Sequence, residues 1–338
     1  MSAMDAKPIP EWRDVTRARF LEEIAPRNAP AVLRGLVRDW PAVQAGRVSA
    51  EAACAYVKRF DIGRPQEILV GPPEIGGRFF YRDDMSGFNF ERQRTTLPDA
   101  LDRILASARD PRPAALYVES TPVAERIPEF SRENTLDLVP PSAGPRIWIG
   151  NATIVQTHFD LNDNIACVIA GRRRFTLFPP DQIGNLYVGP LDFTLSGPPV
   201  SMVDLNAPDL ARFPRFSQAQ AVAQAAELEP GDAIYIPYGW WHQVEALAPF
   251  NMLLNYWWNE YRPANGAPFD AMLHAVMVLR ELPEPQRAVW RSLFDHYAFK
   301  RDGEPVGHLP PEQRGMMGAM NPERVRQIKA ILLRAIGR

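Results

Sequence analysis

The chain has 338 residues, of which 46% are hydrophobic and 23% are charged, so it can build a packed core and is not generally disordered. Its 38 Lys and Arg nearly balance its 40 Asp and Glu, and the net charge of -2 argues against a protein that mainly neutralises nucleic-acid phosphates. Two cysteines exclude a disulfide framework and predict a reducing, cytoplasmic setting.

Three zones of different texture predict how the chain is organised: an α/β part over 1–115, a β core over 116–260 and a helical part over 261–338. Neither a secretory signal nor an apolar run of membrane length is predicted. We therefore expect a protein without a membrane partner, in which the first zone packs on the second.

The first zone mixes helix and strand signals. Apolar residues at helical spacing predict helices over 13–24 and 97–108, and Ser49 is a typical N-cap for a helix that runs through Phe60. The Gly- and Asp-containing segment 76–90 is predicted as a loop, either an ordinary surface loop or one that moves beside a substrate. Short apolar runs predict strands over 31–33, 68–70 and 79–81.

The second zone consists of short β-rich runs cut by Pro and Gly, which is typical of a sandwich or barrel. These runs are 117–119, 146–149, 165–169, 174–178, 233–236 and 251–258. The third zone returns to amphipathic helices over 269–277 and 289–297, followed by a last helix that opens with Asn321 and Pro322.

The first chemical candidate is the run His158-Phe159-Asp160. On a strand, residues two apart point to the same face, so an imidazole and a carboxylate would enter one cavity and could supply two metal ligands. A pattern this short also arises by chance, and the alternative interpretation is a surface histidine paired with an aspartate.

A second histidine strengthens this interpretation. His242 ends a run of turn, apolar strand and Pro/Gly break, so a second strand could deliver a third ligand. Two histidines and one carboxylate leave open positions on the metal and are typical of non-haem Fe(II) oxygenases. The alternative is a core histidine beside Trp241. The remaining histidines, His274, His296 and His308, have no second ligand at strand or helix spacing and are interpreted as structural.

Motifs over most of the chain resemble one known family. They are Trp148-Ile-Gly-Asn-Ala, His158-Phe-Asp160, Gly171-Arg-Arg-Arg-Phe-Thr-Leu-Phe-Pro-Pro180, Gly231-Asp-Ala-Ile-Tyr-Ile-Pro, Trp240-Trp-His242 and Asn255-Tyr-Trp257. The chain resembles the cupin-like JmjC oxygenases, especially their bacterial cupin-like branch, and is similar to the branch of the asparaginyl hydroxylase that acts on hypoxia-inducible factor.

The resemblance implies a mainly β fold with added helices, whose core is a double-stranded β-helix, or jelly roll. It implies Fe(II) on His158, Asp160 and His242, with 2-oxoglutarate as co-substrate. Arg173 stands where the family has a lysine that anchors the far carboxylate of 2-oxoglutarate, although the alternative for 172–174 is a solvated run of charge. The family's other co-substrate contacts match Tyr117, Asn164 and Asn255, for which structural hydrogen bonding is the competing interpretation.

The chain departs from the family pattern at two positions. Val155 replaces a threonine three residues before the first ligand, and Thr157 is a possible substitute for the hydrogen bond that is lost. Arg173 replaces the lysine, which puts the pose of 2-oxoglutarate in question.

The resemblance implies a 2-oxoglutarate-dependent dioxygenase that hydroxylates a protein side chain or a small molecule. The alternatives are a cupin isomerase or hydrolase that uses Zn or Mn, and a non-catalytic regulatory jelly roll. C-terminal helices build homodimers in relatives, and Met272, Met277 and Trp290 would suit such a face. Nucleic acid is not an expected partner.

Overall fold

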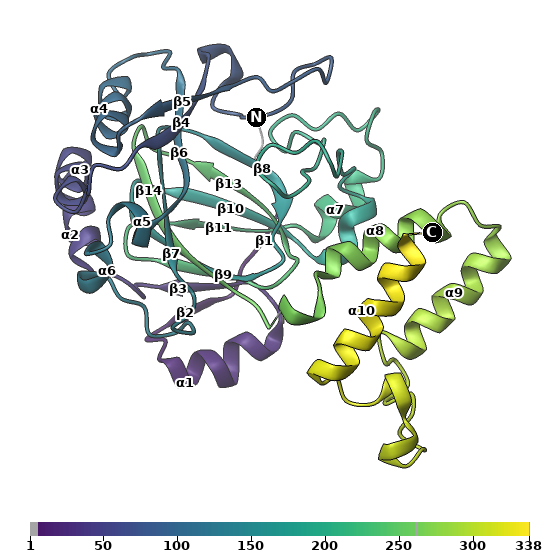
Figure 1. Ribbon diagram of the computed structural model, residues 1–338. Coiled ribbons are helices and arrows are strands. Elements are labelled where there is room, and N and C mark those ends of the chain that lie inside the picture. Colours follow the sequence, from purple (N-terminus) through teal and green to yellow (C-terminus); the bar gives the residue numbers. More distant parts are fainter. Residues whose placement is uncertain (1–5, 261–262, 338) are drawn as a thin grey trace. The chain divides into compact units, whose positions relative to one another are not determined.

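The computed structural model describes residues 6–260 and 263–337, which belong to two compact units, Met1–Asn259 and Glu260–Arg338. All the strands among the described residues lie in the first unit, where Figure 1 shows two sheets facing each other with helices outside them. The two units are described separately below.

Eight consecutive strands of the first unit, four in each of two sheets, form the jelly roll. One sheet holds β8 (Ile154–Phe159), β10 (Arg173–Phe178), β11 (Gln224–Leu228) and β13 (Trp241–Ala246), and the other holds β7 (Pro145–Gly150), β9 (Asp163–Ala170), β12 (Ala233–Ile236) and β14 (Asn251–Trp258). Within each set of four, neighbouring strands are antiparallel. This arrangement confirms the predicted mainly β fold with a jelly-roll core.

Strands from the N-terminal zone extend both sheets, so that they contain five and nine strands in the orders β1-β11-β10-β13-β8 and β2-β3-β12-β9-β14-β7-β6-β4-β5. The added strands are β1 (Lys7–Pro8), β2 (Glu11–Arg13), β3 (Ala31–Arg34), β4 (Gln66–Gly71), β5 (Glu91–Thr95) and β6 (Ala115–Pro122).

Helices cover the outer face of the nine-stranded sheet. Side chains alternate in direction along its strands, so the apolar residues that point outward pack on these helices. On β9, Ile165, Cys167 and Ile169 pack in one cluster with the helices, whereas Ala166 and Val168 belong to the cluster inside the barrel. Helix α2 approaches β9 closely at Gly46, where a Cβ would lie 2.2 Å from the carbonyl oxygen of Ile169. The helices of this unit are α1 (Arg17–Arg19), α2 (Pro41–Val48), α3 (Ala50–Lys58), α4 (Leu97–Ser107), α5 (Val123–Arg126), α6 (Phe130–Glu133) and α7 (Phe216–Val222).

The second unit is helical and has a different packing. Its helices are α8 (Pro268–Leu279), α9 (Glu284–Tyr297) and α10 (Pro322–Ile336). None of the three contains a buried residue, although each carries an apolar stripe. None of the described helices is both long and apolar enough to cross a membrane.

Two predicted elements of the first zone are wrong in part. The helix predicted over 13–24 begins only at Arg17, because Arg13 pairs with Arg34 in the sheet, and it continues as a π-helical turn over Phe20–Ile24. The segment 79–81 is not a strand. Phe79 and Tyr81 are buried through ring packing, and only a single bridge joins Tyr81 to Phe88.

Candidate metal centre

Three potential ligands meet at one end of the barrel. His158 lies near the end of β8, Asp160 follows that strand directly, and His242 lies at the start of β13, where it is paired in register with His158. One ligand atom from each lies within 4.8 Å of the others, and Nε2 of His242 is 3.6 Å from Oδ2 of Asp160. Among the described residues, this is the one group of three His, Cys, Asp or Glu side chains with such geometry.

Backbone carbonyls orient both imidazoles toward this point. Nδ1 of His158 lies 2.8 Å from the carbonyl oxygen of Gln156, and Nδ1 of His242 lies 3.0 Å from that of Trp240. If each Nδ1–H donates to its carbonyl, each Nε2 presents a lone pair to the centre. The backbone amide of Gly239 donates to the carbonyl oxygen of Asp160 and fixes the turn that carries the carboxylate.

The electrostatics of the group suit a divalent cation. Oδ2 of Asp160 is buried, and no hydrogen-bond donor in the described chain reaches it. Burial and the neighbouring His158 lower the pKa of His242 to about 4, so this imidazole is neutral near pH 7. A neutral imidazole and a buried carboxylate oxygen without a hydrogen-bond donor are suitable ligands for a metal ion.

The three ligands also line a small pocket, here called the inner pocket, which contains Arg173. Arg173 comes from β10, is only 2% exposed, and interacts with the hydroxyl group of Tyr117. Its Nε and Nη2 have no hydrogen-bond partner in the described parts of the chain, and burial lowers its pKa. A buried guanidinium without an acid is costly, so the inner pocket favours an anion.

The two asparagines of the inner pocket differ in their bonding. Asn255 uses both ends of its amide, since Oδ1 accepts from Nε1 of Trp148 at 2.7 Å and Nδ2 donates to Oδ1 of Asn164 at 3.2 Å. Asn164 keeps its Nδ2 without a hydrogen-bond partner among the described residues. The arrangement favours a positioning role for Asn255 and leaves Asn164 with a donor for a ligand.

A bulge explains how Val155 and His158 reach the same space. His158 pairs with His242 and Val155 with Val244, so β8 has one more residue than β13 between these pairs. Val155 therefore lines the inner pocket, whereas Thr157 donates its hydroxyl proton to Gln243 and does not line it. Thr157 as a substitute for the missing threonine is wrong for this structure.

In front of the ligands lies a larger cavity of about 510 Å³, here called the outer cavity. Aromatic side chains form much of its wall, and Val155, His158 and Asp160 also line the inner pocket. Part of segment 76–90, predicted as a loop, contributes Phe79 and Phe90 to this wall. An outer and an inner space thus share one metal centre.

Sequence reasoning missed three charged residues of the outer cavity, Arg92, Glu119 and Arg146. A signal existed for Arg146, because this residue lies two positions before Trp148 on β7 and therefore points to the same face of the strand. His274, His296 and His308 lie in the second unit and take no part in the metal group.

Comparison with known proteins agrees with this architecture. The family profile of the cupin-like domain matches residues 17–262. Lysine-specific demethylase JMJ31 of Arabidopsis thaliana is 30% identical over 44% of this chain and 27% of its own length. The tRNA wybutosine-synthesizing protein 5 of Gallus gallus is 26% identical over 83% of this chain and 91% of its own length.

A third relative, lysine-specific demethylase 8 of Xenopus tropicalis, is 24% identical over 74% of this chain and 53% of its own length. The chain thus spans about a quarter and about half of the two demethylases. The family match covers most of the chain and includes all three ligands. The chain therefore belongs to the cupin-like domain family, as an oxygenase-like enzyme of the JmjC type with a His-Asp-His metal site.

Proposed function

We propose that this protein is an Fe(II)- and 2-oxoglutarate-dependent dioxygenase that hydroxylates a protein side chain or a small molecule. The observation that carries the proposal is that two unsatisfied groups line the same inner pocket: the buried Oδ2 of Asp160 at the metal centre and the buried guanidinium of Arg173. The first suits a divalent cation, and the second suits the far carboxylate of a dicarboxylic acid.

In this proposal, His158, Asp160 and His242 would hold Fe(II). Fe(II) with 2-oxoglutarate and O₂ would supply the oxidising power to insert oxygen into a C–H bond, with succinate and carbon dioxide as products. The protein positions these groups.

Residues around the inner pocket would then hold the co-substrate. Arg173 would form an ion pair with the far carboxylate, and the hydroxyl group of Tyr117 lies beside it. The free amide nitrogen of Asn164 would donate a further hydrogen bond. Asn255 fixes Asn164 from behind. Apolar side chains such as Phe175 and Leu253 exclude water from this end of the barrel.

Anaerobic titration of the full chain tests the proposal. We expect wild type to bind Fe(II), and then 2-oxoglutarate only with Fe(II) present. Asp160→Ala should lose both, and Arg173→Met should keep Fe(II) but bind 2-oxoglutarate at least about tenfold more weakly, because a charge-assisted contact is lost. Succinate formation under O₂ is the second readout. Tight Zn or Mn binding with neither 2-oxoglutarate binding nor succinate would favour a cupin hydrolase or isomerase instead.

We also propose that the helical unit forms a homodimer. The support is its exposed apolar surface, since Met272, Met277 and Trp290 are each more than 40% exposed in the single chain. Apolar patches of this kind are typical of interfaces.

A further inference from the structure

The outer cavity contains one cation without a counter-ion. Its lining contains the charged side chains Arg92, Glu119 and Arg146, together with the ligands His158 and Asp160. The two ligands belong to the metal centre. The question is then which of Arg92, Glu119 and Arg146 keeps a charge that no other protein group neutralises.

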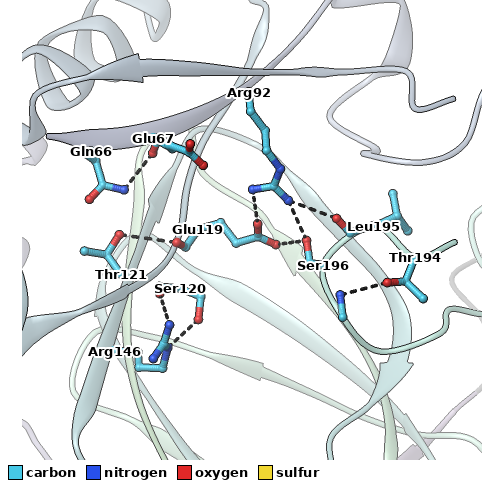
Figure 2. A network of polar contacts seen from close by, with 11 residues as sticks. Gln66, Glu67, Arg92, Glu119, Ser120, Thr121, Arg146, Thr194, Leu195 and Ser196 are labelled. Carbon is cyan, nitrogen blue, oxygen red and sulfur yellow. Dashed lines mark hydrogen bonds and ion pairs between the residues drawn. The ribbon is translucent and has the colours of Figure 1, made fainter. Parts of the chain in front are cut away.

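Arg92 and Glu119 satisfy each other. Nη1 of Arg92 lies 3.2 Å from Oε2 of Glu119, and Nη2 donates to the carbonyl oxygen of Leu195 and to the hydroxyl of Ser196. The other oxygen of Glu119 accepts from the hydroxyl of Ser196. Figure 2 shows this closed group, in which both charges are neutralised within the protein.

Arg146 is held differently. Its Nε donates to Oγ of Ser120 and its Nη2 donates to the carbonyl oxygen of Ser120, both at 2.6 Å, and these are the two contacts that Figure 2 draws for it. No carboxylate of the described residues lies within ion-pair distance of Arg146. Glu125 acts on it from longer range but pairs with Arg126. Nη1 and one proton of Nη2 are therefore free for a ligand.

The backbone at Ser120 is built to hold this guanidinium. Ser120 has φ of +43°, which is uncommon for a residue other than glycine, and it lies in a register shift between β6 and β7. This conformation presents both its hydroxyl and its carbonyl oxygen to Arg146. Backbone strain of this kind persists where the surroundings require it, commonly beside binding sites.

The wall beside Arg146 is aromatic. The guanidinium lies 5.7 Å from the ring centre of Trp257, which contacts Trp148 edge-on, and the contacts continue through Tyr117 to Phe79. Arg146 is only partly exposed, and this burial lowers its pKa. A cavity of about 510 Å³ with an apolar wall and one free cation has the size and character of a small-molecule site.

We propose that the substrate of the outer cavity is a small carboxylic acid with an apolar or aromatic body, and that Arg146 recognises its carboxylate. The fork left free on Arg146 matches two carboxylate oxygens, and the aromatic wall packs the body next to the metal centre. What then happens to this acid rests on the proposed dioxygenase function, whereas its binding does not.

Binding to the full chain tests this proposal with two acids, N-acetylphenylalanine and octanoate, each compared with its own amide. Titrations are run with Mn(II) and saturating 2-oxoglutarate, so that the inner pocket is filled, and repeated without either. We expect at least one acid to bind at least tenfold more tightly than its amide. Arg146→Gln should remove that preference and change 2-oxoglutarate affinity less than twofold. The matched control Arg94→Gln makes the same change of charge at an arginine of β5 that does not line the outer cavity, and it should keep the preference.

Three further outcomes bear on the proposal. Equal binding of acid and amide, no binding of either acid, or an unchanged preference in Arg146→Gln would each overturn it. If Arg146→Gln does not fold, Ser120→Gly replaces it: glycine tolerates the backbone conformation and keeps the carbonyl contact, so the preference should fall by a few fold. Failure of 2-oxoglutarate binding in wild type would count against the proposed function alone, because the titrations without it still report on Arg146.

Discussion

The two units of this chain use apolar side chains in opposite ways. In the first unit, Leu254 and Phe175 are at most 1% exposed, and the helices pack their apolar faces on the nine-stranded sheet. In the second unit, Leu333 is 74% exposed, and the apolar stripes of α8, α9 and α10 contain no buried residue. The first unit therefore carries its own stability, whereas the second has apolar surface that its own helices do not cover.

The sharpest way to break this comparison is the same substitution in each unit. Leu254→Ala removes a fully buried side chain from β14 and should lower the free energy of unfolding by about 2–5 kcal/mol. Leu333→Ala in α10 should change it by less than about 0.5 kcal/mol, because the side chain is already solvated. Chemical denaturation at low protein concentration measures both. Equal losses would show that the second unit has a packed core after all.

Within the first unit, the proposed site should be an exception to the rule that burial stabilises. Arg173→Met replaces an unpaired buried guanidinium by an apolar side chain and should raise the free energy of unfolding by about 1–4 kcal/mol in the absence of ligand. Thermal unfolding with and without 2-oxoglutarate and Mn(II) gives the measurement, with Arg174→Met as a control at a neighbouring arginine that is already paired with Glu227 and Glu245. A loss of stability in Arg173→Met would mean that the cation is structural.

Local patterns were enough to predict much of the first unit and of the site. The spacing of His158 and Asp160, and the parity of Arg173 with Phe175 on one strand, depend only on the two-residue period of a strand. The core strands around Ile165, Ile234 and Leu254 were predicted correctly for the same reason.

What could not be predicted depends on contacts between strands. The bulge that directs both Val155 and His158 into the inner pocket comes from a register shift between β8 and β13. The sequence of either strand alone does not encode this shift. The two hydrogen bonds between Arg146 and Ser120 likewise depend on the register shift between β6 and β7. Phe79 has a high strand propensity, but it lies outside a strand and packs its ring against Phe90, because tertiary contacts override propensity.

The exposed stripes of the second unit lead to a prediction about assembly. If a second copy covers them, Trp290→Glu should weaken self-association by about 2 kcal/mol, or roughly 30-fold in dissociation constant, because buried aromatic residues dominate interfaces. Leu210→Glu, at a similarly exposed residue of the first unit, should have no effect on it. Sedimentation equilibrium over a range of concentrations measures both variants. A wild-type chain that stays monomeric throughout would rule out the dimer.

The smallest expected effect is the loss of stability when a helix N-cap is removed, compared between the two units. Oγ of Ser49 accepts from the backbone amide of Ala52 at the start of α3, and Oδ1 of Asn321 accepts from that of Arg324 at the start of α10. Either change to alanine should cost its helix about 1 kcal/mol.

In α3 this loss should appear in global unfolding, because the buried side chains of Tyr56 and Val57 anchor the helix to the core. In α10 it should appear as faster amide hydrogen exchange in the first turn, with the main unfolding transition unchanged, because no residue of that helix is buried. A main transition that shifts equally for Ser49→Ala and Asn321→Ala would show that the two units unfold as one.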